Sequence, residues 1–230
     1  MNQDIIGVIY SVILITFCIA LSFVVSRKGK KVFGDLCSEV ARKIVHIGVA
    51  NWFFIYVYVF KGIIYPIIGL GVFAFLNGIL NVKGYLKPLM GQENKKRNWG
   101  LVQYPVSIII MLLLSCYNVG DLAALGCGLL GMGYGDGLAS LCGMKFGKTK
   151  LYKGSDKSVI GSVVMTITVF IIVSLIQMVY GAFPFGMGLI FVYALLIGLI
   201  ASTLEAITPY GLDNLSVPLA IYFMSFVLFR

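Results

Sequence analysis

The chain has 230 residues, of which 60% are hydrophobic and 12% charged, with a mean hydropathy of +0.98 and a formal net charge of +9. A soluble domain is closer to half apolar and a quarter charged, so the composition excludes an ordinary soluble protein and indicates a polytopic helical membrane protein. The basic residues lie in short loops between apolar runs, which argues against a nucleic-acid-binding surface.

Runs close to the roughly 20 residues that cross a bilayer predict the transmembrane spans. Seven are expected, at 4–25, 44–60, 63–81, 101–117, 122–143, 159–180 and 187–206. The first lacks a preceding basic segment and a cleavage site, so we expect a retained span rather than a signal peptide. The last run, 217–229, is short for a span and could start nearer Leu212 or be partly re-entrant. The prediction is an all-α integral membrane bundle of about eight spans in one domain, 1–230.

Lysine and arginine alternate between successive loops. The loops 26–43, 82–100 and 144–158 carry six, five and five of them, whereas the loops between carry one (Lys61) or none. The positive-inside rule therefore predicts that these three basic loops face the cytoplasm and that the N-terminus faces outside.

The stretch 131–162 contains an acid inside a predicted span. Asp136 stands between Gly135 and Gly137, and a carboxylate at membrane depth is costly unless it is paired, hydrated or bound to metal. It is a functional candidate, and the alternative is a structural acid paired with a lysine from a neighbouring loop. The surrounding glycines, such as Gly131, indicate either small-residue packing between helices or an unwound or tightly packed helix that lets a ligand reach Asp136.

The loop 144–158 contains five lysines and two glycines. Such a loop could wrap a polyphosphate, because lysine supplies positive charge and glycine exposes backbone N–H groups. It could equally be an anchor that contacts anionic lipid. Lys157 and Ser158, followed by Gly161 and Ser162 at the expected start of a helix, favour phosphate binding, because a helix N-terminus offers unpaired N–H groups.

Other polar groups lie at the same predicted boundary of the membrane. Arg42, Lys43 and His46 open one span, Asn98-Trp-Gly100 opens another, and Glu205 closes a third before residues 209–214. Because all of them fall on the same predicted side of the membrane as Asp136, we expect one site at the cytoplasmic surface. His46 is the single histidine and no cysteines form a C-x-x-C pair, so a multi-histidine or paired-cysteine metal site is not expected.

The order and spacing of these pieces resemble the CTP-dependent lipid kinase family, which includes dolichol kinase, phytol and farnesol kinase, and CTP-using diacylglycerol kinase. The matching segments run from about residue 40 to 218: Arg42-Lys43-Ile-Val-His46, Asn98-Trp-Gly100, Gly135-Asp-Gly-Leu-Ala139, Phe146-Gly-Lys148, Lys157-Ser158 with Gly161-Ser162, and Glu205 with residues 209–218. The first span, 4–25, lies outside them and could be peripheral to the family core. Ile160 stands where the family often has an acid, so the role of that acid is not carried over.

The resemblance implies transfer of the γ-phosphate of CTP to the hydroxyl of a membrane lipid alcohol of polyprenol, dolichol, phytol or diacylglycerol type, with Mg²⁺ or another divalent cation. Asp136 would hold the metal or orient the hydroxyl, and Glu205 or Asp213 would complete a metal and catalytic site. The expected nucleotide-binding residues are Arg42, Lys43, His46, Asn98, Lys148, Lys153, Lys157, Ser158, Gly161 and Ser162. The partners implied are the lipid alcohol, the nucleotide and the bilayer, with no nucleic acid. The expected location is the cell membrane, with the site on its cytoplasmic side.

Three alternatives stay open. A CTP:phosphatidate cytidylyltransferase would use the same nucleotide to make a CDP-lipid, but its longer acidic signature with two nearby aspartates is absent. A transporter could carry Asp136 in its pathway, although no inverted repeat is visible in the sequence. A lipid-binding scaffold would have no chemistry.

Overall fold

The computed structural model describes residues 2–84, 99–117, 122–152, 155, 157–181, 186–208 and 211–229. Within these residues the fold is all-α, as predicted, and contains eight long helices and two short helical segments. The long helices are α1 (Gln3–Lys28), α3 (Cys37–Val59), α4 (Ile64–Val82), α6 (Gly100–Tyr117), α7 (Leu122–Phe146), α8 (Val159–Tyr180), α9 (Met187–Ile207) and α10 (Asp213–Leu228). The short ones, α2 (Lys30–Phe33) and the 3₁₀ segment η1 (Gly34–Leu36), join α1 to α3.

Most of these helices have the length and composition of membrane spans. In the described part of the chain, six are long and apolar enough to cross a bilayer, and α6 and α10 are shorter apolar helices. At 1.5 Å per residue, the 16 residues of α10 extend about 24 Å, less than the roughly 30 Å hydrocarbon core. Its start at Asp213 agrees with the expectation that the last run begins near Leu212.

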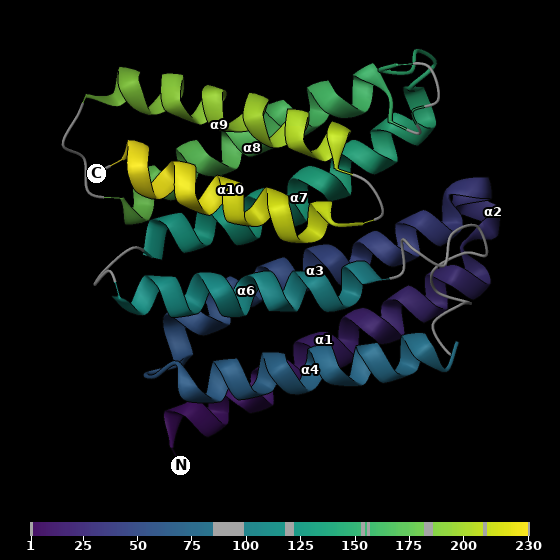
Figure 1. Ribbon diagram of the computed structural model, residues 1–230. Coiled ribbons are helices and arrows are strands. Elements are labelled where there is room, and N and C mark those ends of the chain that lie inside the picture. The colour runs from purple at the N-terminus through teal and green to yellow at the C-terminus, as the bar shows by residue number, and fades with distance from the viewer. Residues whose placement is uncertain are drawn as a thin grey trace.

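The helices form two layers (Figure 1). The order α1, α3, α7, α8 makes one layer, and the order α4, α6, α10, α9 makes the other. α7 is the central element, since it packs against α3, α8, α10 and α6. Almost all its residues from Ala123 to Gly137 are buried.

The glycines of α7 permit close packing. A Cβ on Gly133 would lie 2.2 Å from Cβ of Ala50 on α3, and one on Gly135 would lie 2.7 Å from Sδ of Met165 on α8. α7 runs unbroken from Leu122 to Phe146, so the expectation of an unwound helix is wrong, and the glycines allow close packing of a continuous helix.

α3 begins earlier than the sequence predicted. The expected loop 26–43 is largely helical, and α3 starts at Cys37 rather than near residue 44. The apolar pattern places the start too late because the first two turns of α3 carry polar side chains that face protein rather than lipid. Arg42 and Lys43 consequently lie on a helix, at fixed spacing from His46.

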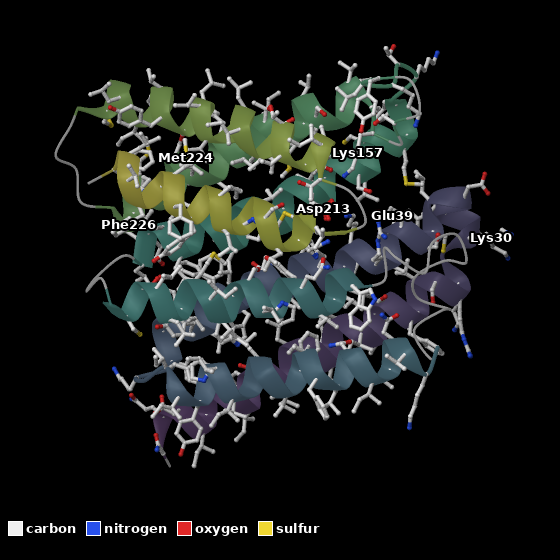
Figure 2. All side chains as sticks on the ribbon, in the orientation of Figure 1. Lys30, Glu39, Lys157, Asp213, Met224 and Phe226 are labelled. Carbon is white, nitrogen blue, oxygen red and sulfur yellow. The ribbon has the colours of Figure 1, made fainter. Side chains whose placement is uncertain are left out.

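The basic connection between α7 and α8 folds back over the end of the bundle. Val159 N–H donates to Thr149 O, and Leu151 N–H donates to Lys157 O. Figure 2 shows Glu39, Lys157 and Asp213 near one another at this end, whereas Met224 and Phe226 lie toward the other end. Helices that are distant in the sequence therefore bring their polar ends together at this end of the bundle.

Candidate active site

A cavity opens where the ends of six helices meet, at the end of the bundle that carries the basic connection. α3, α6, α7, α8, α9 and α10 all contribute to its wall. Its lining consists of Glu39, Arg42, Lys43, His46, Gly100, Leu101, Asp136, Ala139, Ser140, Gly143, Met144, Lys150, Lys157, Ser158, Gly161, Ser162, Glu205, Gly211, Asp213 and Asn214.

The deeper ionic group lies between α3 and α7. Lys43 Nζ is 2.5 Å from Asp136 Oδ2, and it is also 3.6 Å from Glu39 Oε1. Arg42 Nη2 lies 2.6 Å from Glu39 Oε1, and the hydroxyl of Ser140 on α7 donates to the same oxygen. We call Glu39, Arg42, Lys43, His46, Asp136 and Ser140 the α3–α7 cluster. Its spacing follows from the helix, because residues three and four apart on α3 share a face.

His46 completes this cluster without a firm hydrogen bond. Its Nε2 atom is buried, lies 3.4 Å from Asp136 Oδ2, and has no hydrogen-bond partner among the described residues. The imidazole stacks on Tyr104 of α6 at a centroid distance of 4.5 Å, and the Tyr104 hydroxyl donates to Leu129 O at 2.8 Å. The packing fixes the ring while one nitrogen faces the carboxylate.

A second ionic group lies nearer the surface. Lys157, on the connection before α8, contacts Glu205 Oε1 at the end of α9 and lies 3.6 Å from Asp213 Oδ2 at the start of α10. We call these three residues the Lys157 cluster. Burial alone would lower the pKa of Lys157, but the carboxylates of Glu205, Asp136 and Asp213 outweigh it and hold that pKa above its usual value. Lys157 is therefore a cation at neutral pH.

The described lining is balanced in charge. Four cations, Arg42, Lys43, Lys150 and Lys157, face the four carboxylates of Glu39, Asp136, Glu205 and Asp213. An incoming polyanion would therefore have to exchange partners with these ion pairs. Two of its lysines each contact two carboxylates: Lys43 contacts Asp136 and Glu39, and Lys157 contacts Glu205 and Asp213.

The three carboxylates predicted to hold a metal do not form one group. Among the described residues, no three His, Cys, Asp or Glu side chains gather closely enough to hold an ion. Glu205 and Asp213 contact the same ammonium group, whereas Asp136 pairs with Lys43. Mg²⁺ at nucleotide sites commonly uses one or two carboxylates together with phosphate and water oxygens. The donor chemistry of Glu205 and Asp213 fits such an ion.

The structure brings together most of the predicted site residues. The cavity lining includes Arg42, Lys43, His46, Asp136, Lys157, Ser158, Gly161, Ser162, Glu205 and Asp213. Lys148 is exposed and is absent from that lining. Asn98 and Lys153 lie outside the described residues, so their predicted roles stay predictions.

Ser158 has a structural function in addition to its place in the cavity. Its Oγ caps α8 by accepting from Gly161 N–H at 3.1 Å, and Val159 N–H is already bonded to Thr149 O. These two N–H groups at the start of α8 are therefore paired, contrary to the expectation that they are free for phosphate. Gly161 also permits close packing, since a Cβ there would lie 3.1 Å from Ala139 O on α7.

Sequence reasoning missed Glu39, Ser140 and Lys150. Glu39 stands four residues before Lys43, a spacing that would have indicated an ion pair had α3 been extended to Cys37. Ser140 stands four residues after Asp136 on α7 and shares its face in the same way. Lys150 carries no local signal that separates it from the other lysines of its loop.

The fold and the cavity define a class: a multi-pass α-helical membrane protein with a buried, charge-balanced polar site at one end of its bundle. The chain is 32% identical to the phytol kinase of Synechocystis sp. over 190 residues, which cover 79% of this chain and 76% of that protein. It is also 32% identical over 135 residues to a probable chloroplastic phytol kinase 1 of Oryza sativa subsp. japonica, covering 56% and 43% of the two chains.

The chain therefore belongs to the phytol kinase family, and it is a phosphotransferase with an alcohol acceptor. The resemblance to lipid kinases seen in the sequence is confirmed at this level, but neither relative is a dolichol or diacylglycerol kinase. No protein-family model matches the chain, and no solved structure matches it.

Proposed function

We propose that this protein transfers the γ-phosphate of CTP to the hydroxyl of an isoprenoid alcohol of the phytol type, at the cytoplasmic surface of the cell membrane. The observation that carries the proposal is the convergence of Asp136, Lys157, Glu205 and Asp213 in one cavity at the end of a membrane bundle. The relatives, both described as phytol kinases, support the acceptor class. CTP as the donor rests on the sequence resemblance described above.

The two ionic groups bind different substrates in this proposal. Phosphoryl transfer needs positioning and charge neutralisation more than covalent chemistry from the protein. In the proposed mechanism, Lys157 moves from its carboxylates to the triphosphate, while the α3–α7 cluster keeps its ion pairs. Glu205 and Asp213, freed from Lys157, would hold Mg²⁺, which neutralises charge on the phosphate oxygens when it is bound.

Asp136 receives the acceptor hydroxyl. Its Oδ2 atom lies beside Lys43 Nζ and faces His46 Nε2, so an alcohol placed there can donate its proton to the carboxylate while its oxygen faces the phosphate. The alcohol oxygen forms a bond to the γ-phosphorus as the bond from that phosphorus to the β–γ bridging oxygen breaks. The nucleoside diphosphate leaves, and the hydroxyl proton passes to Asp136.

The decisive assay uses purified protein in detergent with Mg²⁺ and labelled CTP or ATP. Phytol, farnesol, a polyprenol and diacylglycerol are offered in turn, and the phosphorylated lipid is measured. We expect transfer from CTP to phytol or farnesol. Transfer from ATP alone would overturn the proposed donor, transfer only to diacylglycerol would overturn the acceptor, and formation of a CDP-lipid from phosphatidate would show a cytidylyltransferase instead.

The cytoplasmic location can be tested separately. Lys150 lines the cavity, and Lys61 lies at the opposite end of α3. In a variant with all five cysteines replaced, we expect an impermeant thiol reagent to label Lys61→Cys in intact cells and Lys150→Cys only after the membrane is opened. The reverse pattern would place the site on the outer face.

A further inference from the structure

A second cavity, apolar and separate from the charged one, lies between α1, α3 and α4. Its lining is almost entirely hydrocarbon and aromatic: Val8, Ser11, Val12, Ile15, Thr16, Val49, Trp52, Phe60, Tyr65, Pro66, Gly69, Leu70, Val72, Phe73 and Leu76. The indole N–H of Trp52 donates to Ser11 Oγ at 2.8 Å, so its polar atom is already paired. The ring packs against Tyr56 and Phe60 and contributes an apolar wall to the cavity.

Both cavities have a wall on α3 and are lined by different residues of that helix. His46 lines the charged cavity, and Val49, three residues later, lines the apolar one. Three residues of helix rise about 4.5 Å, and positions three apart lie on nearly the same face. The apolar cavity then follows α3 from Val49 to Phe60, a rise of about 16 Å. It therefore begins one helical turn deeper than the charged site and continues toward the other end of the bundle.

We infer that the apolar cavity receives the isoprenoid chain of the alcohol whose hydroxyl lies at Asp136; this inference rests on the proposed function. A lipid alcohol has one polar end and a long chain, and the arrangement along α3 matches that order. Because the surrounding bilayer is as apolar as the cavity, affinity for the chain comes from close packing in the cavity rather than from its apolar character alone. Its effect is to position a long chain so that the hydroxyl reaches the phosphate.

Two glycines of α4 provide a matched test. A Cβ on Gly69 or on Gly71 would meet no atom within 4 Å, so a side chain can be added at either position without a clash at the Cβ. Only Gly69 lines the cavity. Gly69→Leu should narrow the space for the chain, and Gly71→Leu adds the same bulk to the same helix on a different face.

The kinetic experiment compares phytol with prenol, its short counterpart, as acceptors. For Gly69→Leu we expect kcat/KM for phytol to fall by about tenfold while the value for prenol is unchanged, because only the long chain loses its position. Gly71→Leu should change neither. Equal loss with both alcohols, or no loss with phytol, would overturn the inference.

A binding experiment is independent of catalysis. Trp52 and Trp99 are the two tryptophans of the chain, so Trp99→Phe leaves Trp52 as the sole indole. In lipid-free detergent we expect a long alcohol brominated in mid-chain to quench Trp52 fluorescence, and phytol but not prenol to reverse the quenching. Failure of phytol to compete, or competition by phospholipid alone, would overturn the inference. Quenching without turnover on any alcohol would count against the proposed kinase and leave the chain site standing.

Discussion

The α3–α7 cluster and the Lys157 cluster contain the same kinds of group but are built differently. Lys43 projects from the second turn of α3 and Asp136 from the middle of α7, both within packed helices, and their side chains are 5% and 9% exposed. Lys157 projects from a connection, its side chain is 22% exposed, and its carboxylates come from the ends of two other helices. The first cluster is held by the fold, whereas the second can change partners without disturbing a helix.

This difference suggests why the acceptor and the nucleotide would use different clusters. A hydroxyl must be placed within a fraction of an ångström of its line of attack, which suits groups fixed by helix packing. A nucleotide and its cation must enter and leave in every cycle, which suits a lysine on a connection and carboxylates at helix ends.

The largest loss of catalytic activity is expected from Asp136→Asn, which keeps the size of the side chain and removes its charge. We expect kcat to fall by about 10²-fold or more, a loss of at least roughly 2.7 kcal/mol of transition-state stabilisation. The fold should persist, because Lys43 still has Glu39 Oε1 at 3.6 Å. Turnover measured with CTP and phytol, together with a thermal unfolding curve, checks both statements.

Asp35→Asn is the matched control, since Asp35 is exposed in η1 and lies outside the cavity. Asp4 is a poorer control, because its Oδ1 accepts from the N–H groups of Lys61 and Gly62. Well-folded Asp136→Asn protein with normal turnover would make Asp136 a structural partner of Lys43 and move the chemistry to the Lys157 cluster.

A smaller effect, confined to the nucleotide, is expected from Lys157→Ala. Removing a charge-assisted contact to phosphate should raise the KM for the nucleotide about tenfold, or roughly 1.4 kcal/mol, and change the KM for the alcohol little. Lys145→Ala is the comparison, because Lys145 is an exposed lysine of α7 outside the cavity lining. Equal changes in both KM values would contradict the division between the clusters.

A still smaller effect, on the Mg²⁺ requirement, is expected from Asp213→Asn. If Glu205 and Asp213 share a cation during the reaction, loss of one carboxylate should raise the Mg²⁺ concentration for half-maximal activity by about threefold to tenfold, and excess Mg²⁺ should restore much of the rate. Activity is titrated against free Mg²⁺ at saturating substrates. An unchanged midpoint with a lower maximum would assign Asp213 to packing, through the hydrogen bonds that its Oδ1 accepts from Asn214.

The sequence predicted the helices and much of the cavity because two simple patterns carry that information. Apolar runs located the long helices, and an acid inside such a run, Asp136, led to the cavity that it lines. Glu39 was missed because hydropathy counts a polar first turn as loop even when it is helical. The pairing of Lys157 with Glu205 could not be predicted, since it depends on how a connection folds over the ends of two helices.

The smallest effect is expected from Tyr104→Phe, which tests how the α3–α7 cluster is held. The substitution removes the hydroxyl that donates to Leu129 O at 2.8 Å and keeps the ring that stacks on His46. Loss of one buried hydrogen bond should lower the free energy of unfolding by about 1 kcal/mol. Turnover should stay within about twofold of the native value, because packing of the ring rather than the hydroxyl fixes the imidazole. Tyr104→Leu, which removes the ring as well, should lower kcat further than Tyr104→Phe at matched thermal stability. If both variants lose the same activity, the cluster depends on the hydroxyl, and the view that helix and ring packing hold it in place would have to be given up.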